Sequence, residues 1–103
     1  MSCLSWFLLP QQSVKIEFDP TKSARNVRNR GLPFELTADL DWSAARVRRD
    51  QRRDYGEERF VALVPMSARL YVVCYCVRGD ARRIISFRKA NQREERAYAK
   101  TFG

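Results

Sequence analysis

Arginine is the residue type with the most chemistry to offer in this chain. Sixteen of the twenty basic side chains are arginines, and the twelve acidic side chains leave a net charge of +8 in 103 residues. Residues 1–45 are neutral in sum, so the whole excess belongs to residues 46–103. A guanidinium keeps its charge at physiological pH and makes paired hydrogen bonds to phosphate oxygens. The charge pattern therefore indicates a polyanionic partner.

The other groups that commonly do chemistry are scarce. The chain has no histidine, which excludes the usual general base at neutral pH and every nucleophile–histidine pair. Its three cysteines, Cys3, Cys74 and Cys76, form no C-x-x-C motif and favour neither a disulfide framework nor a zinc site. We expect no metal or cofactor, a reduced cytoplasmic setting, and core packing for Cys74 and Cys76.

The length suits one compact domain with a modest core. We interpret residues 14–103 as that domain. Residues 1–13 are interpreted as an N-terminal extension, either loosely ordered or translated from a start codon upstream of the natural one. The apolar run over residues 4–10 is too short to span a bilayer.

Helix signals place three helices around the predicted strands. Asp19 as N-cap, Pro20 at the first helical position and Gly31 as the stop predict a helix up to Arg30. Its apolar stripe is narrow, with Ala24 and Val27 as its members. Further helices are predicted over residues 33–41 and after an Asn91 cap.

Apolar alternation predicts strands over residues 14–18, 59–64, 70–77 and 83–88, with a weak edge strand around Ala45 and Val47. The strand over residues 70–77 is apolar on both faces and is expected at the centre. Short connections between the last three strands predict an antiparallel meander. The predicted fold is therefore α+β, an antiparallel three- to four-stranded sheet with helices packed mainly on one face.

The same alternation assigns side chains to the two faces of the sheet. Ile85 and Phe87 are expected to point into the core, which leaves Ser86 and Arg88 near an open face. Arg83 shares the Ile85 side by simple alternation. Only a bulge or its position at the end of the strand would bring Arg83 beside Arg88.

Four segments stand out as motifs. They read I-E-F-D-P-T-K-S-A over residues 16–24, R-G-L-P-F over residues 30–34, R-R-D-Y-G-E-E-R-F-V-A-L over residues 52–63 and R-I-I-S-F-R-K-A over residues 83–90. In order and spacing they resemble the BrnT family, ribonuclease toxins of bacterial toxin–antitoxin pairs, over essentially residues 14–98. The chain departs from the family pattern at Arg30, where histidine is common, and in the basic run of residues 46–49.

The resemblance implies a small RelE-like ribonuclease that arrests translation by cleaving RNA, with mRNA as the expected substrate. It also implies a partner, the ribbon-helix-helix antitoxin BrnA, which covers the toxin and represses the shared operon. The charge alone supports equally well a non-catalytic nucleic-acid-binding module. A degenerate toxin without activity and a protein that only meets an acidic partner are further alternatives.

RNA cleavage needs no metal when the neighbouring 2′-OH is the nucleophile, provided that the protein aligns it, accepts its proton and neutralises the phosphate. Following the resemblance, we place Arg88 and Arg83 at the phosphate, with Arg59 as a third candidate. The other catalytic candidates are Lys22, as a phosphate contact, and Glu58 or Glu57, as the base. The residues expected to bind RNA are Arg48, Arg52, Arg53, Tyr75 and Ser86. The structural alternatives are rim ion pairs of Arg83 and Arg59 with Glu57 or Glu58, and sheet packing for Tyr75.

Overall fold

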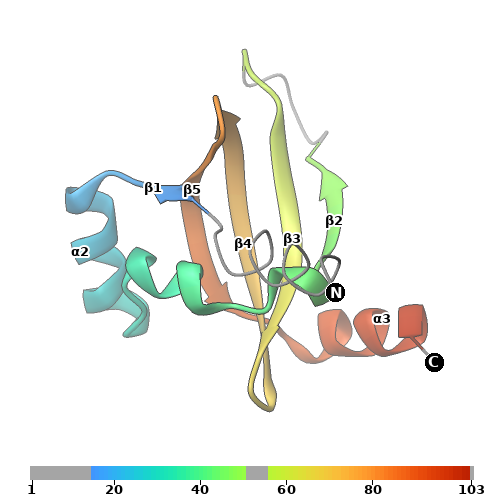
Figure 1. The fold of residues 1–103 in the computed structure, drawn as a ribbon. Coiled ribbons are helices and arrows are strands. Elements are labelled where there is room, and N and C mark those ends of the chain that lie inside the picture. The colour runs from blue at the N-terminus through green and yellow to red at the C-terminus, as the bar shows by residue number, and fades with distance from the viewer. Residues whose placement is uncertain (1–14, 51–55, 103) are drawn as a thin grey trace, which may run out of the picture.

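The fold is a twisted sheet with short helices around it (Figure 1). The computed structural model describes residues 15–50 and 56–102, so the proposed extension, Cys3, Arg52 and Arg53 lie outside the described residues. The elements are β1 (Ile16–Glu17), α2 (Pro20–Arg30), the 3-10 helices η1 (Phe34–Asp39) and η2 (Trp42–Ala44), β2 (Arg46–Arg49), β3 (Arg59–Met66), β4 (Arg69–Arg78), β5 (Ala81–Lys89) and α3 (Gln92–Phe102).

The sheet has five strands in the order β1-β5-β4-β3-β2. Strands β3 to β5 form the predicted antiparallel meander and β2 extends it at the edge, but β1 runs parallel to β5. The expectation of a purely antiparallel sheet of three or four strands is therefore wrong. Local connection lengths predict only pairs of neighbouring strands, whereas β1 pairs with the last strand of the chain. At the other edge, all four residues of β2 are exposed.

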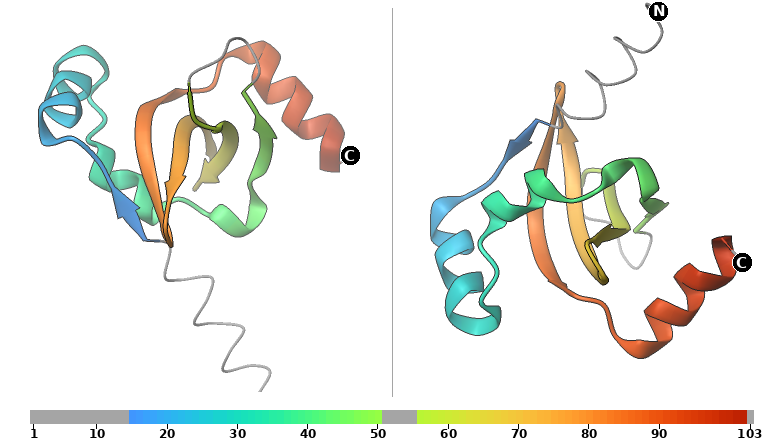
Figure 2. Two further views of the ribbon diagram at one scale, coloured as in Figure 1. Left: turned by 90° about the horizontal axis from the view of Figure 1, so that it is seen from above. Right: turned by 60° about the horizontal axis from the view of Figure 1, so that its bottom comes forward.

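The helices lie on both sides of the sheet. Viewed from above, η1 and η2 run along one face, α3 lies on the opposite side, and α2 stands beside β5 (Figure 2). This differs from the expected packing on mainly one face, because α3 is anchored by polar contacts at the opposite face. Glu94, in the first turn of α3, accepts hydrogen bonds from Arg88 of β5 at 2.9 and 2.8 Å. Further along α3, the Tyr98 hydroxyl donates a hydrogen bond to the Ala44 carbonyl, just before β2, at 2.7 Å. In the described part of the chain, no helix is long and apolar enough to cross a membrane.

The main core lies between the sheet and the 3-10 helices. Phe34 of η1, Phe87 of β5 and Val73 of β4 are almost fully buried there. Strand β4 is buried over most of its length, as predicted from its two apolar faces. Aromatic rings pack edge to face in this core, with 5.6 Å between the ring centroids of Trp42 and Tyr75. Cys74 and Cys76 are buried as expected, on the opposite face of β4.

A β-bulge in β5 decides which residues face the core. Cys74 pairs with Ser86 and the next residue, Tyr75, pairs with Ile84, so Ile85 is the extra residue. Ile84 and Phe87 therefore both point into the core, whereas Ile85 is only half-buried. The expected core position of Ile85 is wrong, because one inserted residue breaks the two-residue alternation.

Helix α2 begins and ends where its caps predict. The Asp19 side chain accepts a hydrogen bond from the Thr21 N–H, and Gly31 adopts φ 72°, the left-handed conformation that glycine tolerates. The expected apolar stripe does not dock the helix, because Ala24 and Val27 are exposed. Polar side chains on another face make the contacts instead.

Ser23 and Asn26 are the side chains that attach α2. The Ser23 hydroxyl accepts a hydrogen bond from the Phe34 N–H at 2.9 Å. The Asn26 amide donates to the Leu32 carbonyl at 2.7 Å and to the Phe87 carbonyl at 2.9 Å. Asn26 therefore joins α2 to β5 directly after the bulge, and it donates to two backbone carbonyls.

Replacing Asn26 tests this attachment. Asn26→Asp keeps the shape of the side chain but turns its two donors into acceptors that face two carbonyls. We expect a loss of about 1–3 kcal/mol in the free energy of unfolding, measured by urea denaturation. The same change at the exposed Asn29, one turn further along α2, is expected to stay within about 0.5 kcal/mol. Equal losses at both positions would show that the Asn26 bonds do not anchor the helix.

Candidate functional site

The sheet face away from the main core carries arginines at its margins and small apolar residues at its centre. Cross-strand pairing places Arg83, Cys76 and Arg59 in one row. The next row contains Ser86, Cys74, Val61 and Arg48, and the third contains Arg88, Val72, Leu63 and Arg46. We call these three rows the arginine face.

Ser86 lies between two arginines on β5. Its row is separated by two β4 residues from the row of Arg83 and by two from the row of Arg88. At the usual rise per residue, each row is roughly 7 Å from its neighbour. A phosphate above Ser86 would thus lie within side-chain reach of both guanidiniums. The bulge produces this arrangement, because without it Arg83 would face the core.

Arg88 makes the strongest ion pair of the face, with α3. Its guanidinium donates to both carboxylate oxygens of Glu94, at 2.9 and 2.8 Å. Glu94 also accepts from the Asn91 N–H, while the Asn91 side chain accepts from the Glu94 N–H, both at 2.8 Å. This reciprocal capping box fixes the start of α3 against the sheet. The bonds from Arg88, aided by that from Asn91, lower the pKa of the Glu94 carboxyl against the opposing effect of partial burial.

Arg83 and Arg59 also have carboxylate partners. Arg83 Nη1 lies 3.2 Å from Oε1 of Glu17, which stands in the same row on β1. Arg59 Nε lies 3.8 Å from Oε2 of Glu57, and Arg78 Nη2 lies 3.3 Å from Oε1 of the same carboxylate. The rim ion pairs considered for Arg83 and Arg59 therefore exist, with Glu17 rather than Glu57 or Glu58 as the partner of Arg83.

Lys22 approaches the arginine face from outside the sheet. Lys22 lines a groove between α2 and β5 together with Ser86. The structure therefore brings Lys22 near Ser86, the β5 residue between Arg83 and Arg88. Arg48 stands on the arginine face at the β2 side, in the row of Ser86. Five of the predicted site residues, Arg88, Arg83, Arg59, Ser86 and Arg48, thus share one face.

Two predicted residues are not brought to this face. Glu58 lies 2.6 Å from Arg49 at the other edge of the sheet. Tyr75 is buried in the main core, where it stacks on Phe60 with 5.6 Å between ring centroids. The structural alternative of sheet packing therefore describes Tyr75.

Sequence reasoning missed Glu17 and Glu94. Glu94 had a detectable signal, because Asn91 followed three residues later by a glutamate is a capping-box pattern. Glu17 had none, since its pairing with Arg83 depends on the parallel strand β1 and spans 66 residues. Both carboxylates hold arginines of the candidate site.

The lowered pKa of Glu94 predicts a pH-dependent contribution to stability. The pKa of Glu94 is lower in the folded state than in the unfolded state, where it is about 4.3. The ion pair with Arg88 therefore contributes its full stabilisation of the folded state at pH values above the unfolded pKa. The contribution is lost as the pH falls through the lowered folded value. Glu94→Gln keeps the capping bond but removes the charge, and we expect a loss of about 1 kcal/mol at pH 7.

The measurement is urea unfolding of both proteins between neutral and acid pH. The difference between wild type and Glu94→Gln should shrink below the unfolded pKa. The exposed neighbour Glu95→Gln serves as the control and is expected to stay within about 0.5 kcal/mol at each pH. A Glu94→Gln difference that does not change with pH would contradict the ion-pair assignment.

The arrangement can hold a phosphodiester between fixed guanidiniums, with a carboxylate beside one of them. Among the described residues, no group of three or more acidic or cysteine side chains could hold a metal ion. The Glu17–Arg83 pair places a carboxylate directly beside a guanidinium that could bind a phosphate. Charge neutralisation and proton transfer at a phosphate are therefore the chemistry that this face could support.

Comparison with known proteins assigns the family. A search of curated proteins and a search of solved structures found no match. The family model for the ribonuclease toxin BrnT of type II toxin–antitoxin systems matches residues 18–94. The matched segment covers most of the chain, from the residue before the Asp19 cap to Glu94, and includes every described strand except β1. The chain belongs to the BrnT family of ribonuclease toxins of type II toxin–antitoxin systems.

Proposed function

We propose that the protein is a metal-independent endoribonuclease that inhibits translation by cleaving mRNA. The observation that carries the proposal is the placement of Arg83 and Arg88 on either side of Ser86, on one face of the sheet. Fixed positive charges around a phosphate stabilise the charge that grows there during cleavage. The likeness of the fold to RelE, implied by the sequence resemblance, belongs to the same proposal.

In the proposed reaction the RNA supplies its own nucleophile. Glu17 accepts the proton of the 2′-OH, and the 2′ oxygen forms a bond to the adjacent phosphorus. The bond from phosphorus to the 5′ oxygen breaks, and the leaving oxygen takes a proton from solvent. The products are a 2′,3′-cyclic phosphate and a 5′-OH. Arg83 and Arg88 neutralise the non-bridging oxygens, and Lys22 contacts the phosphate.

Glu17 replaces the predicted bases Glu58 and Glu57 because of position. Glu57 contacts Arg59 of β3, two strands away from β5. Glu58 is paired with Arg49 at the β2 edge, three strands away from β5. Glu17 already contacts Arg83, and the pair is partly exposed, with 45% of the Glu17 side chain accessible. Exposed ion pairs contribute about 0–1 kcal/mol, so a phosphate can take over Arg83 and leave the carboxylate beside the reacting ribose.

Replacement of Arg83 tests the catalytic assignment. Arg83→Ala should lower the rate of cleavage of a labelled single-stranded RNA about a hundredfold or more, as loss of one preorganised donor typically does. Arg69→Ala is the matched control, since Arg69 is an exposed strand arginine at the far end of β4. Its cleavage rate should equal that of the wild type. Equal rates for both variants would remove Arg83 from the mechanism.

Changes to the RNA and to the metal content of the same assay test the proposed nucleophile and the independence from metal. A single 2′-deoxy sugar at the cut position should abolish cleavage there, and chelator should leave cleavage of the normal RNA unchanged. Cleavage at the deoxy position, or loss of activity with chelator, would contradict the proposed nucleophile. RNA binding without any cleavage by the wild type would favour the non-catalytic binding module or a degenerate toxin.

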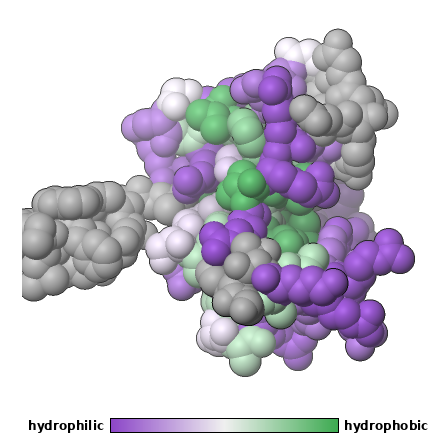
Figure 3. All heavy atoms as spheres, turned by 90° about the vertical axis from the view of Figure 1, so that its right-hand side faces the viewer, coloured by the Kyte–Doolittle hydropathy of each residue, from purple (hydrophilic) through white to green (hydrophobic). Residues whose placement is uncertain are grey.

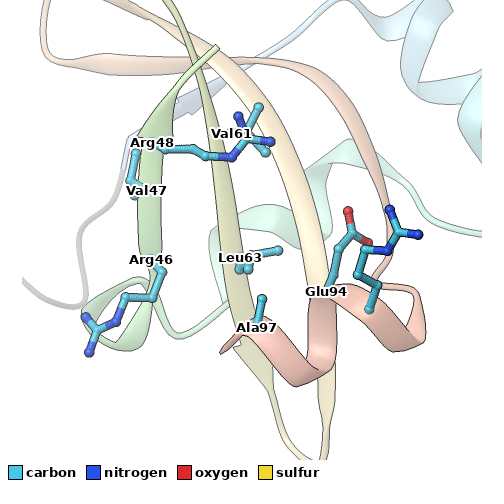
Figure 4. A pocket seen from close by; sticks show the side chains of 8 residues that line it. Arg46, Val47, Arg48, Val61, Leu63, Glu94 and Ala97 are labelled. Carbon is cyan, nitrogen blue, oxygen red and sulfur yellow. The ribbon is translucent and has the colours of Figure 1, made fainter. Parts of the chain in front are cut away.

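We further propose that the antitoxin, a ribbon-helix-helix protein like BrnA, docks in a groove on the β2 side of the arginine face. The groove lies between α3 and strands β2 and β3 and has a volume of about 280 Å³ (Figure 4). Val61, Leu63 and Ala97 supply apolar walls. Figure 3 shows the side of the molecule where β2 and α3 lie in Figure 1, and hydrophobic surface there is bordered by hydrophilic side chains. An antitoxin in this groove would cover Arg88 and Arg48.

The lining of the groove favours an acidic protein segment. Arg46, Arg48 and Arg93 border it, and its single carboxylate, Glu94, is already bonded to Arg88. The walls contain no aromatic ring or side-chain amide with which to stack or read a nucleobase. Apolar side chains flanked by carboxylates therefore match the groove better than RNA does.

Charge reversal on α3 tests this docking site. Arg93→Glu should weaken binding of a BrnA-like ribbon-helix-helix antitoxin about tenfold or more, because the new carboxylate would repel the acidic segment proposed for the antitoxin. Arg96→Glu is the control, since Arg96 is an exposed residue of the same helix that does not line the groove. Isothermal titration calorimetry compares the two variants. Equal losses of affinity would exclude the groove as the specific site.

A further inference from the structure

A second groove adjoins the arginine face at its opposite margin. It lies between α2 and β5 and has a volume of about 270 Å³. Lys22, Arg25 and Arg30 of α2 line one side, and Ile85 and Ser86 of β5 line the other. Ser86 belongs to both the groove and the arginine face, so a ligand held between Arg83 and Arg88 could continue into the groove.

The charge of this groove is uncompensated. No acidic residue lines it. Within residues 15–50 and 56–102, Lys22, Arg25 and Arg30 make no ion pair, whereas Arg83 and Arg88 each have a carboxylate partner. Three cations around one hollow repel each other, and an anion in the hollow would relieve that repulsion. The groove is therefore suited to a phosphate.

The remaining lining is suited to a nucleobase. Ile85, the extra residue of the bulge, is half-buried and provides an apolar surface. Asn29 presents a side-chain amide that makes no hydrogen bond within the described residues. The neighbouring Asn26 amide is occupied by the Leu32 and Phe87 carbonyls, which keeps this wall rigid. An amide can donate to and accept from the edge of a base, and an apolar surface can pack against its plane.

We propose that the groove between α2 and β5 binds a nucleotide of single-stranded RNA next to the one that is cleaved. Arg25 and Arg30 hold its phosphate, while Ile85 supports its base and Asn29 reads the edge of that base. The groove thus acts as a specificity-determining subsite. The proposal rests on the proposed function for the position of the cut, but its binding test does not depend on cleavage.

The probe is a set of uniformly 2′-O-methylated oligonucleotides of about twelve residues, one for each base. They lack the free 2′-OH and cannot be cut by the proposed mechanism. Fluorescence anisotropy at several salt concentrations between about 50 and 200 mM gives the affinity and its salt dependence. Each phosphate contact on a single strand contributes roughly −0.7 to the log–log slope.

Arg25→Gln and Arg28→Gln form the matched pair. Both residues are exposed on α2 and each variant removes one charge, but Arg28 does not line the groove. Arg25→Gln should weaken binding to all four probes and make the slope shallower by about 0.7. Arg28→Gln should leave the slope unchanged. Equal slopes for the two variants would overturn the phosphate assignment.

Asn29→Ala tests the reading of the base. It should leave the salt slope unchanged and reduce the difference in affinity between the best and the worst probe about fivefold. An unchanged ranking and spread would overturn the role of Asn29. Weaker antitoxin binding by Arg25→Gln, with unchanged oligonucleotide binding, would assign the groove to a protein partner.

Cleavage of unmodified RNA by the wild type separates this inference from the proposed function. If the wild type cuts RNA but Arg25→Gln and Arg28→Gln bind alike, only the subsite fails. If the wild type cuts nothing but Arg25→Gln alone loses a phosphate contact, the groove stands as a nucleotide site and the catalytic proposal fails.

Discussion

The inserted residue Ile85 is the constraint on which the candidate site depends. A regular strand would place Arg83 on the core side, beneath the 3-10 helices, where an unpaired charge is costly. With the bulge, Ile84 and Phe87 both reach the core, and Arg83 joins Ser86 and Arg88 on the other face. Asn26 holds the strand directly after the bulge by bonding to the Phe87 carbonyl. One irregularity in one strand thereby serves both the core and the arginine face.

Local signals predicted the elements well, and features that join distant segments were not predictable. The Asp19 cap, the Gly31 stop and the apolar strand over residues 70–77 each depend on neighbouring residues, and the structure confirms all three. The sequence indicated that either a bulge or a position at the strand end could bring Arg83 beside Arg88. The alternation of apolar and polar residues could not decide between them, because it carries no sign of an inserted residue. The parallel pairing of β1 and the polar docking of α2 through Asn26 both depend on partners far along the chain.

The arginine face and the α2 groove differ in their electrostatics. Arg83, Arg59 and Arg88 are held in place by carboxylates, which orients them before any substrate arrives. A phosphate must exchange for those partners, at small cost where the pair is exposed and at larger cost for the bidentate pair of Arg88. The cations of α2 need no such exchange. An anion would therefore be attracted first to the groove and then positioned on the face.

The free edge of the sheet has a different consequence. An exposed edge strand can extend its ladder with the edge of a second molecule, which is a common first step of aggregation. In β2, three of the four side chains are arginines, Arg46, Arg48 and Arg49. Two such strands brought together would place arginine against arginine at one or more positions, so self-association through this edge is disfavoured. The same basic run that brings Arg48 to the candidate site thus also opposes edge-to-edge pairing of two β2 strands.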